Sequence, residues 1–192
     1  MKLIGITGGI GSGKSTIAKV FESMGYPVYN SDTRAKYLIN NNTELIKSIK
    51  NSFGNDIYNS QGLDRQKMAS LVFNNPEKLK LLNSITHPAV GNDFNLWANS
   101  QSTPFVLKEA AILFETGIYK SLYKTILVSA PQETRIERVI KRDNTTAKEV
   151  LARMKNQWSE EKKTELADYV IDNSGEKLVI PQVIELIQVL IK

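Results

Sequence analysis

The chain has 192 residues, of which 41% are apolar and 23% are charged, a composition typical of a globular protein with one core and a small insertion. It contains no cysteine, which excludes disulfides and thiolate metal sites and suits a cytosolic setting, and it lacks the run of about 18 apolar residues that a membrane span requires. The formal net charge of +5 favours solubility or the attraction of polyanions such as nucleotides, whereas a nucleic-acid partner would require tighter Lys/Arg blocks.

Five short apolar runs are rich in β-branched residues and continuous rather than alternating in polarity, which is typical of parallel strands buried on both faces. Helical patterns lie between them, so the sequence predicts an α/β fold with a five-stranded parallel sheet flanked by helices. The expected strands are Lys2–Thr7, Tyr26–Tyr29, Pro104–Leu107, Thr125–Ser129 and Tyr169–Asp172. The expected helices around the sheet are Ser15–Met24, Pro131–Lys141 and Pro181–Ile191.

The strand signal lapses between Ser31 and Ser102, where we expect a helical insertion on the ligand-binding side of the sheet. Its predicted helices are Thr33–Ile39, Thr43–Phe53, Asp64–Phe73 and Pro76–Thr86, with His87-Pro88 as a turn between two helices. Residues 146–166 form a second helical excursion, charged and poor in large aliphatic residues, which favours a mobile arm. The predicted organisation is a core of residues 1–31, 103–145 and 167–192, an insertion of residues 32–102 and an arm of residues 146–166.

The segment GITGGIGSGKST contains the full pattern G-x-x-x-x-G-K-[ST] at Gly8, Gly13, Lys14 and Ser15, between an apolar strand and a helix. Glycines let the backbone turn with its N–H groups pointing inward, which makes an anion site at a helix N-terminus. Lys14 is expected to reach the β- and γ-phosphates of a nucleoside triphosphate and the Ser15 hydroxyl to coordinate Mg²⁺. A dinucleotide fingerprint fits less well, because it leaves Lys14-Ser15 unexplained.

The rest of the chain favours a small-molecule kinase over a switch or a motor. It has no guanine-reading N-K-x-D segment, and its D-x-x-G, at residues 172–175, follows the last strand. Arg138 and Arg142 are four residues apart, so one helical face can present both to a transferring phosphoryl group. The alternative is a solvated helix flank with acidic neighbours such as Asp143 as ion-pair partners, and for Arg135 we favour that alternative.

Three carboxylates follow predicted strands, where ligands meet such sheets. Asp32 could accept the proton of an attacking hydroxyl and help to hold Mg²⁺, or it could cap the helix that follows. Glu109 and Glu115 could be acids near the metal, but an ordinary helix start explains them as well.

Taken together, these segments resemble the dephospho-CoA kinase family of P-loop kinases, over nearly the whole chain. The segments that carry the resemblance are TGGIGSGKST (7–16), the strand ending in Asp32, LLNSITHP (81–88), AILFE (111–115), ETRIERVIKRD (133–143), Arg153 with Gln157, and ADYVIDNSG (167–175). The family usually has Asp-x-Asp after the second strand, whereas this chain has Asn30-Ser31-Asp32, so any metal role of the first position is in doubt.

The resemblance implies that ATP phosphorylates the ribose 3′-hydroxyl of dephospho-CoA, which gives coenzyme A and ADP. It implies Asp32 as general base, Arg138 and Arg142 as phosphate contacts, His87 within the substrate-binding insertion, and residues 146–166 as a lid. The expected nucleotide-binding residues are Gly8, Gly9, Gly11, Ser12, Gly13, Lys14, Ser15, Thr16 and, near the adenine, Asn173. We further expect a cytoplasmic monomer or small homo-oligomer without a nucleic-acid or membrane partner.

Two other functions stay open from the residues themselves. One is a P-loop kinase with a different acceptor, either a nucleoside monophosphate or a sugar-like acid. The other is a regulatory protein that hydrolyses ATP slowly and signals by movement of its arm. Stimulation of ADP release by a small-molecule acceptor separates the kinases from the regulator.

Overall fold

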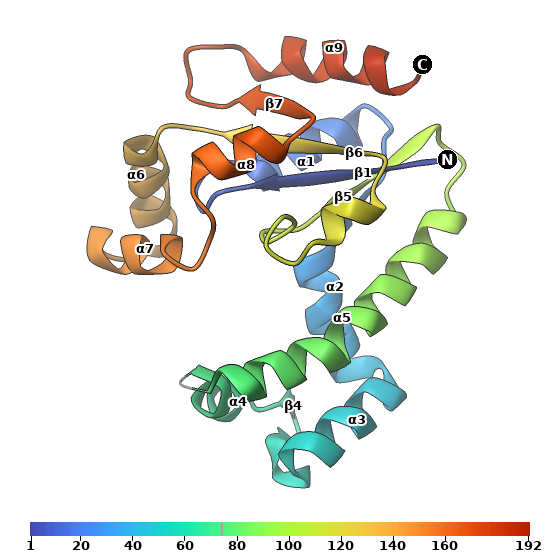
Figure 1. The fold of residues 1–192 in the computed structure, drawn as a ribbon, viewed down its shortest axis with the longest axis vertical. Helices are drawn as coiled ribbons and strands as arrows, with labels where there is room; N and C mark the ends of the chain where they lie inside the picture. Colours follow the sequence, from blue (N-terminus) through green and yellow to red (C-terminus); the bar gives the residue numbers. More distant parts are fainter. Residues whose placement is uncertain (74) are drawn as a thin grey trace. The chain divides into compact units, whose positions relative to one another are not determined.

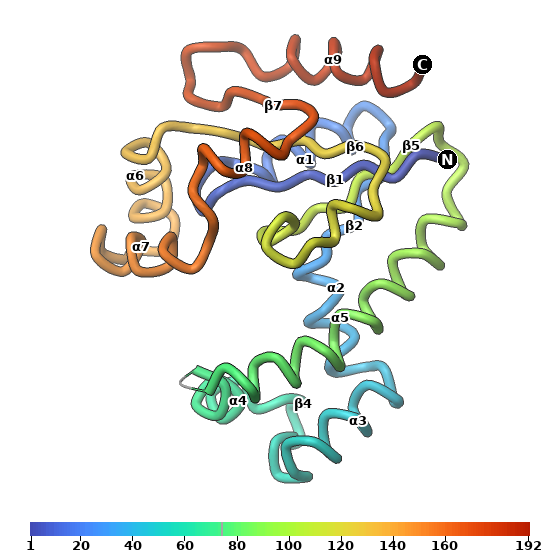
Figure 2. Tube along the Cα trace, in the orientation of Figure 1, coloured from blue at the N-terminus to red at the C-terminus, as the bar shows by residue number. Residues whose placement is uncertain are grey.

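Five parallel strands form one sheet in the order β2-β5-β1-β6-β7 in the computed structural model, which describes residues 1–73 and 75–192 (Figures 1 and 2). This confirms the predicted α/β fold, and every predicted strand boundary lies within two residues of the observed one. All five strands run parallel, so their carboxyl ends meet at one edge of the sheet. The strands are β1 (Lys2–Gly8), β2 (Val28–Asn30), β5 (Phe105–Glu109), β6 (Lys124–Ser129) and β7 (Tyr169–Asp172).

Side chains alternate between the two faces of the sheet, and each face is covered differently. Ile4 and Ile6 of β1 point into the main apolar cluster, to which α1 and α9 contribute. Gly5, between them, faces the other side, where a side chain would collide with Leu113 and Leu122 at 2.6 and 2.7 Å. That second face is covered by the segment after β5 and by α8, which lies against β6 (Figure 1). Both faces are therefore buried, which explains the continuous apolar runs.

The helices of this unit agree with the predictions to within two residues at each end, except in the arm. There the structure has two helices, the first of which begins with a capping box between Thr146 and Glu149. The helices are α1 (Lys14–Ser23), α6 (Gln132–Asp143), α7 (Ala147–Met154), α8 (Glu160–Leu166) and α9 (Val179–Leu190), with a 3₁₀ turn, η2, at Ile118–Ser121. Together with the sheet they make one compact unit of residues 1–30 and 101–192.

Residues 31–100 form a second compact unit, whose described residues are mainly helical and include one short hairpin. The long helix α5 packs against the other three helices of this unit, and its buried residues Val90 and Phe94 lie in that interior. The elements are α2 (Ser31–Asn41), α3 (Thr43–Phe53), η1 (Asn55–Ile57), β3 (Tyr58–Asn59), β4 (Gly62–Leu63), α4 (Arg65–Phe73) and α5 (Pro76–Asn99). The hairpin lies between the predicted helices Thr43–Phe53 and Asp64–Phe73, where the sequence predicts no strand.

The predicted turn at His87-Pro88 is wrong, because α5 continues through it to Asn99. Proline lacks the N–H that would bond to the carbonyl four residues earlier, so it weakens a helix interior without always ending it. The helix persists here because burial of Thr86, Val90 and Phe94 on both sides of Pro88 outweighs that loss.

Among the residues that the structure describes, no helix has the length and apolar character needed to cross a bilayer.

Asp168 ties the edge strand β7 to β6 at the amino ends of the two strands. Its carboxylate accepts hydrogen bonds from the Thr125 backbone N–H (2.8 Å), the Thr125 hydroxyl (2.9 Å) and Lys124 Nζ (2.7 Å). Burial raises the pKa of Asp168, but the Lys124 ammonium and the Thr125 bonds outweigh it and hold the pKa below its ordinary value. The ionised form is therefore the one that the fold stabilises.

We predict that Asp168→Asn lowers the free energy of unfolding at pH 7 by roughly 1 kcal/mol, a value reduced by the partial exposure of the carboxylate. A group with a lowered folded pKa stabilises above its unfolded pKa and loses that contribution as pH falls through the folded pKa. Denaturant titrations from pH 7 to pH 3 should therefore show a smaller loss in the variant than in the wild type. Glu22→Gln, on the exposed side of α1, is the control. An equal loss of unfolding free energy between pH 7 and pH 3 in Asp168→Asn and the wild type would contradict the prediction.

Candidate functional site

The phosphate loop (residues 8–15) joins β1 to α1 at the carboxyl edge of the sheet. Gly11 and Gly13 adopt φ of 81° and 87°, in the left-handed region that glycine tolerates best. Neighbouring groups also fill the space that side chains would need: Arg135 lies against Gly9 and Gly11, and the Asn173 amide lies against Gly13. The glycines are therefore required both by the turn and by close packing.

A buried carboxylate at this edge gathers the two residues that the pattern predicted to act on phosphate and metal. Glu109, the last residue of β5, is 4% exposed. Its Oε1 accepts hydrogen bonds from Lys14 Nζ, with which it is also ion-paired, and from Ser15 Oγ at 2.7 Å. Its Oε2 accepts a bond from Asn30 Nδ2 at 2.6 Å, which the register of β2 against β5 places opposite Glu109. Lys14, Ser15, Asn30 and Glu109 thus form one polar cluster.

Glu109 is ionised within this cluster. Burial raises its pKa, but the hydrogen bond and charge of Lys14, with the bonds from Ser15 and Asn30, outweigh burial and hold the pKa below its ordinary value. The cluster offers carboxylate, hydroxyl and amide oxygens, the hard ligands that Mg²⁺ prefers. Its donor set therefore fits a magnesium ion that completes its coordination with water and phosphate.

The sequence predicts an end of this strand at Leu107 and leaves two explanations for Glu109 and Glu115, an acid near the metal or a helix start. The structure corrects this: Glu109 is part of β5, and the residues after it form turns. The available signal was the strand itself, since a carboxylate at the end of a buried parallel strand lies at the ligand-binding edge.

Asn173 and Arg138 lie on the other side of the loop. Asn173 Nδ2 donates to the backbone carbonyl of Ser12 at 2.7 Å. The backbone carbonyl of Asn173 accepts a hydrogen bond from Arg138 Nη2 at 2.9 Å. Arg138 Nη1 is buried without a hydrogen-bond partner among the described residues. A buried cationic donor that is not satisfied is suited to an anionic ligand. The two predicted residues are thus brought to the phosphate loop.

Arg142 has a different environment. Its guanidinium forms two hydrogen bonds with Asp143, at 2.7 and 3.1 Å, and Arg153 binds the same carboxylate at 2.8 Å. The bond from Arg142, then that from Arg153, lowers the pKa of Asp143 to about 2. The ion pair named as the alternative for Arg142 is therefore present.

Arg135 is not the solvated flank that the sequence favoured. It is 8% exposed, and its Nη1 lies 3.5 Å from Glu160 Oε2 of α8. Arg135 is buried because Gly9 and Gly11 of the phosphate loop have no side chains, which lets the arginine pack directly against the loop backbone.

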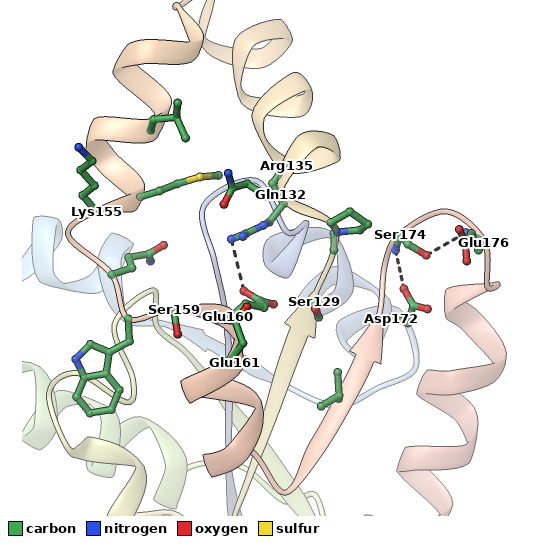
Figure 3. Close-up of a pocket in the computed structure, with 17 residues that line it drawn as sticks. Ser129, Gln132, Arg135, Lys155, Ser159, Glu160, Glu161, Asp172, Ser174 and Glu176 are labelled. Atoms are coloured by element: carbon green, nitrogen blue, oxygen red, sulfur yellow. Dashed lines mark hydrogen bonds and ion pairs between the residues drawn. The ribbon is translucent and has the colours of Figure 1, made fainter.

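A cavity of about 860 Å³ opens on this side of the loop, and Figure 3 shows Arg135 and Glu160 pointing toward one another within it. Its described lining includes Arg135 and Gln157 but not Lys14, Ser15 or Arg138. Further residues that line it are Ser129, Gln132, Lys155, Ser159, Glu160, Glu161, Asp172, Ser174 and Glu176. The cavity therefore lies beside the predicted nucleotide site and is lined by other residues.

Asp32 and His87 belong to the helical unit, where both are exposed. Asp32 lies in the first turn of α2, and the chain reaches it two residues after Asn30 of the polar cluster. His87 lies in the middle of α5. A bidentate ion pair joins these two helices, with Arg34 Nε and Nη2 at 2.9 and 2.6 Å from the carboxylate of Asp93.

Comparison with known proteins gives one family over almost the whole chain. Residues 2–178 match the family described as Dephospho-CoA kinase. A relative named Dephospho-CoA kinase from Bacteroides fragilis is 37% identical, over 96% of this chain and 90% of its own length. A crystal structure from Thermus thermophilus has a TM-score of 0.88 and 36% identity, covering 98% of this chain and 96% of that chain. A shikimate kinase from Acinetobacter baumannii shares the fold alone, with a TM-score of 0.53 and 15% identity over 98% of this chain and 92% of that chain. The chain therefore belongs to the dephospho-CoA kinase family, as the resemblance of its motifs predicted.

Proposed function

We propose that this protein transfers the γ-phosphoryl group of ATP to the ribose 3′-hydroxyl of dephospho-CoA, giving coenzyme A and ADP. The observation that carries the proposal is the polar cluster at the phosphate loop, in which Glu109 holds Lys14 and Ser15 at the carboxyl edge of the sheet. Family membership supports the acceptor. The remaining assignments below extend this proposal to individual residues.

ATP binds with its β- and γ-phosphates in the loop formed by residues 8–16, and with its adenine near Asn173. The Lys14 side chain moves from Glu109 to the phosphates, where its ammonium stabilises the negative charge of the transferred phosphoryl group. Mg²⁺ would neutralise negative charge on the phosphates. Ser15, Glu109 and Asn30 would hold it beside the loop, and the ionised state of Glu109 suits a cation there.

Asp32 accepts the proton of the 3′-hydroxyl as attack on the γ-phosphorus proceeds in line. Its exposure and its place in the first turn of α2 leave the carboxylate available to a substrate. Residues 32–102 receive dephospho-CoA, with His87 among the contacts. Arg138 and Arg142 stabilise the charge that develops on the transferring group.

Residues 146–166 act as a lid whose closure excludes water and limits ATP hydrolysis. The proposed setting is the cytoplasm, with no nucleic-acid or membrane partner and with a monomer or small homo-oligomer as the working form. These points rest on composition and on the family, and each stays a prediction.

The acceptor is tested by ADP release from MgATP with dephospho-CoA, a panel of nucleoside monophosphates, or shikimate. We expect strong stimulation by dephospho-CoA alone, with a new 3′-phosphate detected in the product by mass and NMR. Stimulation by another acceptor would keep the kinase and replace its substrate. No stimulation by any acceptor would favour a nucleotide-dependent regulator.

We predict that Asp32→Asn lowers kcat by about 10²–10⁴-fold, because an amide cannot take the proton of the attacking hydroxyl. The KM for ATP should change by less than about twofold, since Asp32 is assigned no contact with the triphosphate. Steady-state kinetics with both substrates varied give the two constants. Asp56→Asn, an exposed carboxylate of the same helical unit, is the control. Near-normal turnover of Asp32→Asn would remove Asp32 as the base.

We predict that Glu109→Gln weakens the effect of Mg²⁺ on nucleotide binding. All three partners of Glu109 donate hydrogen bonds, and the NH₂ end of glutamine cannot accept one. The gain in ADP affinity on adding Mg²⁺ should fall at least about tenfold, and kcat should fall about 10²-fold, since Lys14 loses its partner and Ser15 its orientation.

Calorimetric titration of ADP with and without Mg²⁺ measures the first effect independently of turnover. Because the folded pKa of Glu109 lies below its ordinary value, the wild-type Mg²⁺ effect should persist at pH 5 and above. Glu133→Gln, on the exposed side of α6, is the matched control. A Glu109→Gln variant with the wild-type Mg²⁺ response would show that the carboxylate serves only the packing of β5.

A further inference from the structure

One backbone N–H of the phosphate loop is committed to a side chain from the distant arm. The N–H of Ile10 donates to Gln157 Oε1 at 3.0 Å, across 147 positions of sequence. In the same turn the N–H of Ser12 bonds back to the carbonyl of Gly9. The first half of the loop is thus fixed by bonds within the protein, and the N–H groups of Gly11, Gly13, Lys14 and Ser15 remain for an anion.

The other end of the same amide binds the segment that follows β5. Gln157 Nε2 donates to the carbonyl of Ala111 at 3.0 Å. Ala111 lies two residues after Glu109, so the glutamine bridges the loop to the backbone that carries the carboxylate. This bridge needs a donor and an acceptor at one planar end, which among uncharged side chains only an amide of this length supplies here.

The residues after Gln157 also contact the segment that follows β5 and the surroundings of the phosphate loop. The N–H of Trp158 donates to Glu115 Oε1 at 2.9 Å, and Lys163, which is 1% exposed, lies 3.4 Å from that oxygen. Glu160 pairs with Arg135, which in turn lies against Gly9. The segment that follows Gln157, including the charged helix α8, is thereby held in place, which makes it the fixed end of the proposed lid and keeps the amide on the loop.

We propose that Gln157 is a positioning residue that sets the affinity of the phosphate loop for nucleotide, by holding the Gly9–Gly11 turn in the shape that points the later N–H groups at the phosphates. The inference rests on the proposed function of the loop, and it adds the link between the arm and that loop. Its role is distinct from substrate contact, since the amide is occupied by Ile10 and Ala111.

The test compares Gln157→Met with the wild type. Methionine keeps the length and approximate volume of glutamine and removes both amide bonds. The Kd for ADP and the KM for ATP should rise about tenfold, which corresponds to the loss of roughly one net hydrogen bond in the ordered loop. The KM for dephospho-CoA should stay within about twofold of the wild-type value.

Thr125→Val is the matched control, because it also removes a side chain that both donates and accepts. The Thr125 hydroxyl donates to Asp168 and accepts from the Asp168 N–H, at the opposite edge of the sheet. Both variants should lower Tm by a similar amount, but only Gln157→Met should shift the Kd for ADP. A Gln157→Met protein with lowered Tm and unchanged ADP affinity would overturn the proposal and leave Gln157 with a packing role.

Amide hydrogen exchange on the wild-type protein gives a second test that needs no variant. The Ile10 N–H should be protected before any nucleotide is added and gain less than about twofold with ADP, whereas the N–H groups of Gly11, Gly13, Lys14 and Ser15 should gain strongly. Fast exchange at Ile10 that only ADP suppresses would refute the proposal. Failure of the wild type to bind ADP at all would instead count against the proposed function of the loop.

Discussion

Lys14 and Glu109 are opposite charges at the ligand-binding edge of the sheet, and each is the main partner of the other. Leaving either one alone in such a buried place would cost several kcal/mol, so each charge stabilises the other at this edge. It also shapes binding. In the proposed reaction Lys14 moves to the phosphates and Glu109 loses its cation, and a metal ion would restore the charge balance. Under this proposal, metal-bound nucleotide is therefore expected to bind better than bare nucleotide.

The strands and the loop were predictable because their signals are local. Parallel strands buried on both faces must be continuously apolar, and a phosphate-binding turn must carry glycines at fixed spacing, so both could be recognised from neighbouring residues alone. Glu109 and Pro88 show where local signals fail. A carboxylate at a strand end and a proline in a helix are decided by contacts with distant residues, namely Lys14 and the buried side chains of α5.

In the arm, the burial of charged side chains likewise could not be predicted from neighbouring residues. Residues 146–166 are rich in charged side chains, which favours a solvated segment when composition is the only guide. In the structure Lys163 is buried, because it pairs with Glu115, which lies 48 residues earlier in the sequence. Whether a charge faces water or the interior depends on its partner, and sequence spacing does not reveal a partner so far away. The burial of Arg135 was not predicted for the same reason, because its neighbours Glu160 and the phosphate loop are distant in sequence.

Arg142 of α6 and Arg153 of the arm share the carboxylate of Asp143, and this shared contact suggests how the arm would respond to a ligand. Both guanidinium groups are held by Asp143, whose pKa of about 2 keeps the carboxylate charged at any physiological pH. Protonation of Asp143 at physiological pH therefore does not release the arginines, whereas a competing anion can. A triphosphate offers more negative charge and more acceptor oxygens than one carboxylate, so it can draw an arginine away from an exposed pair that is worth little in water. In this proposal the lid closes through exchange of one anion for another at the arginines, with no change in the protonation of Asp143.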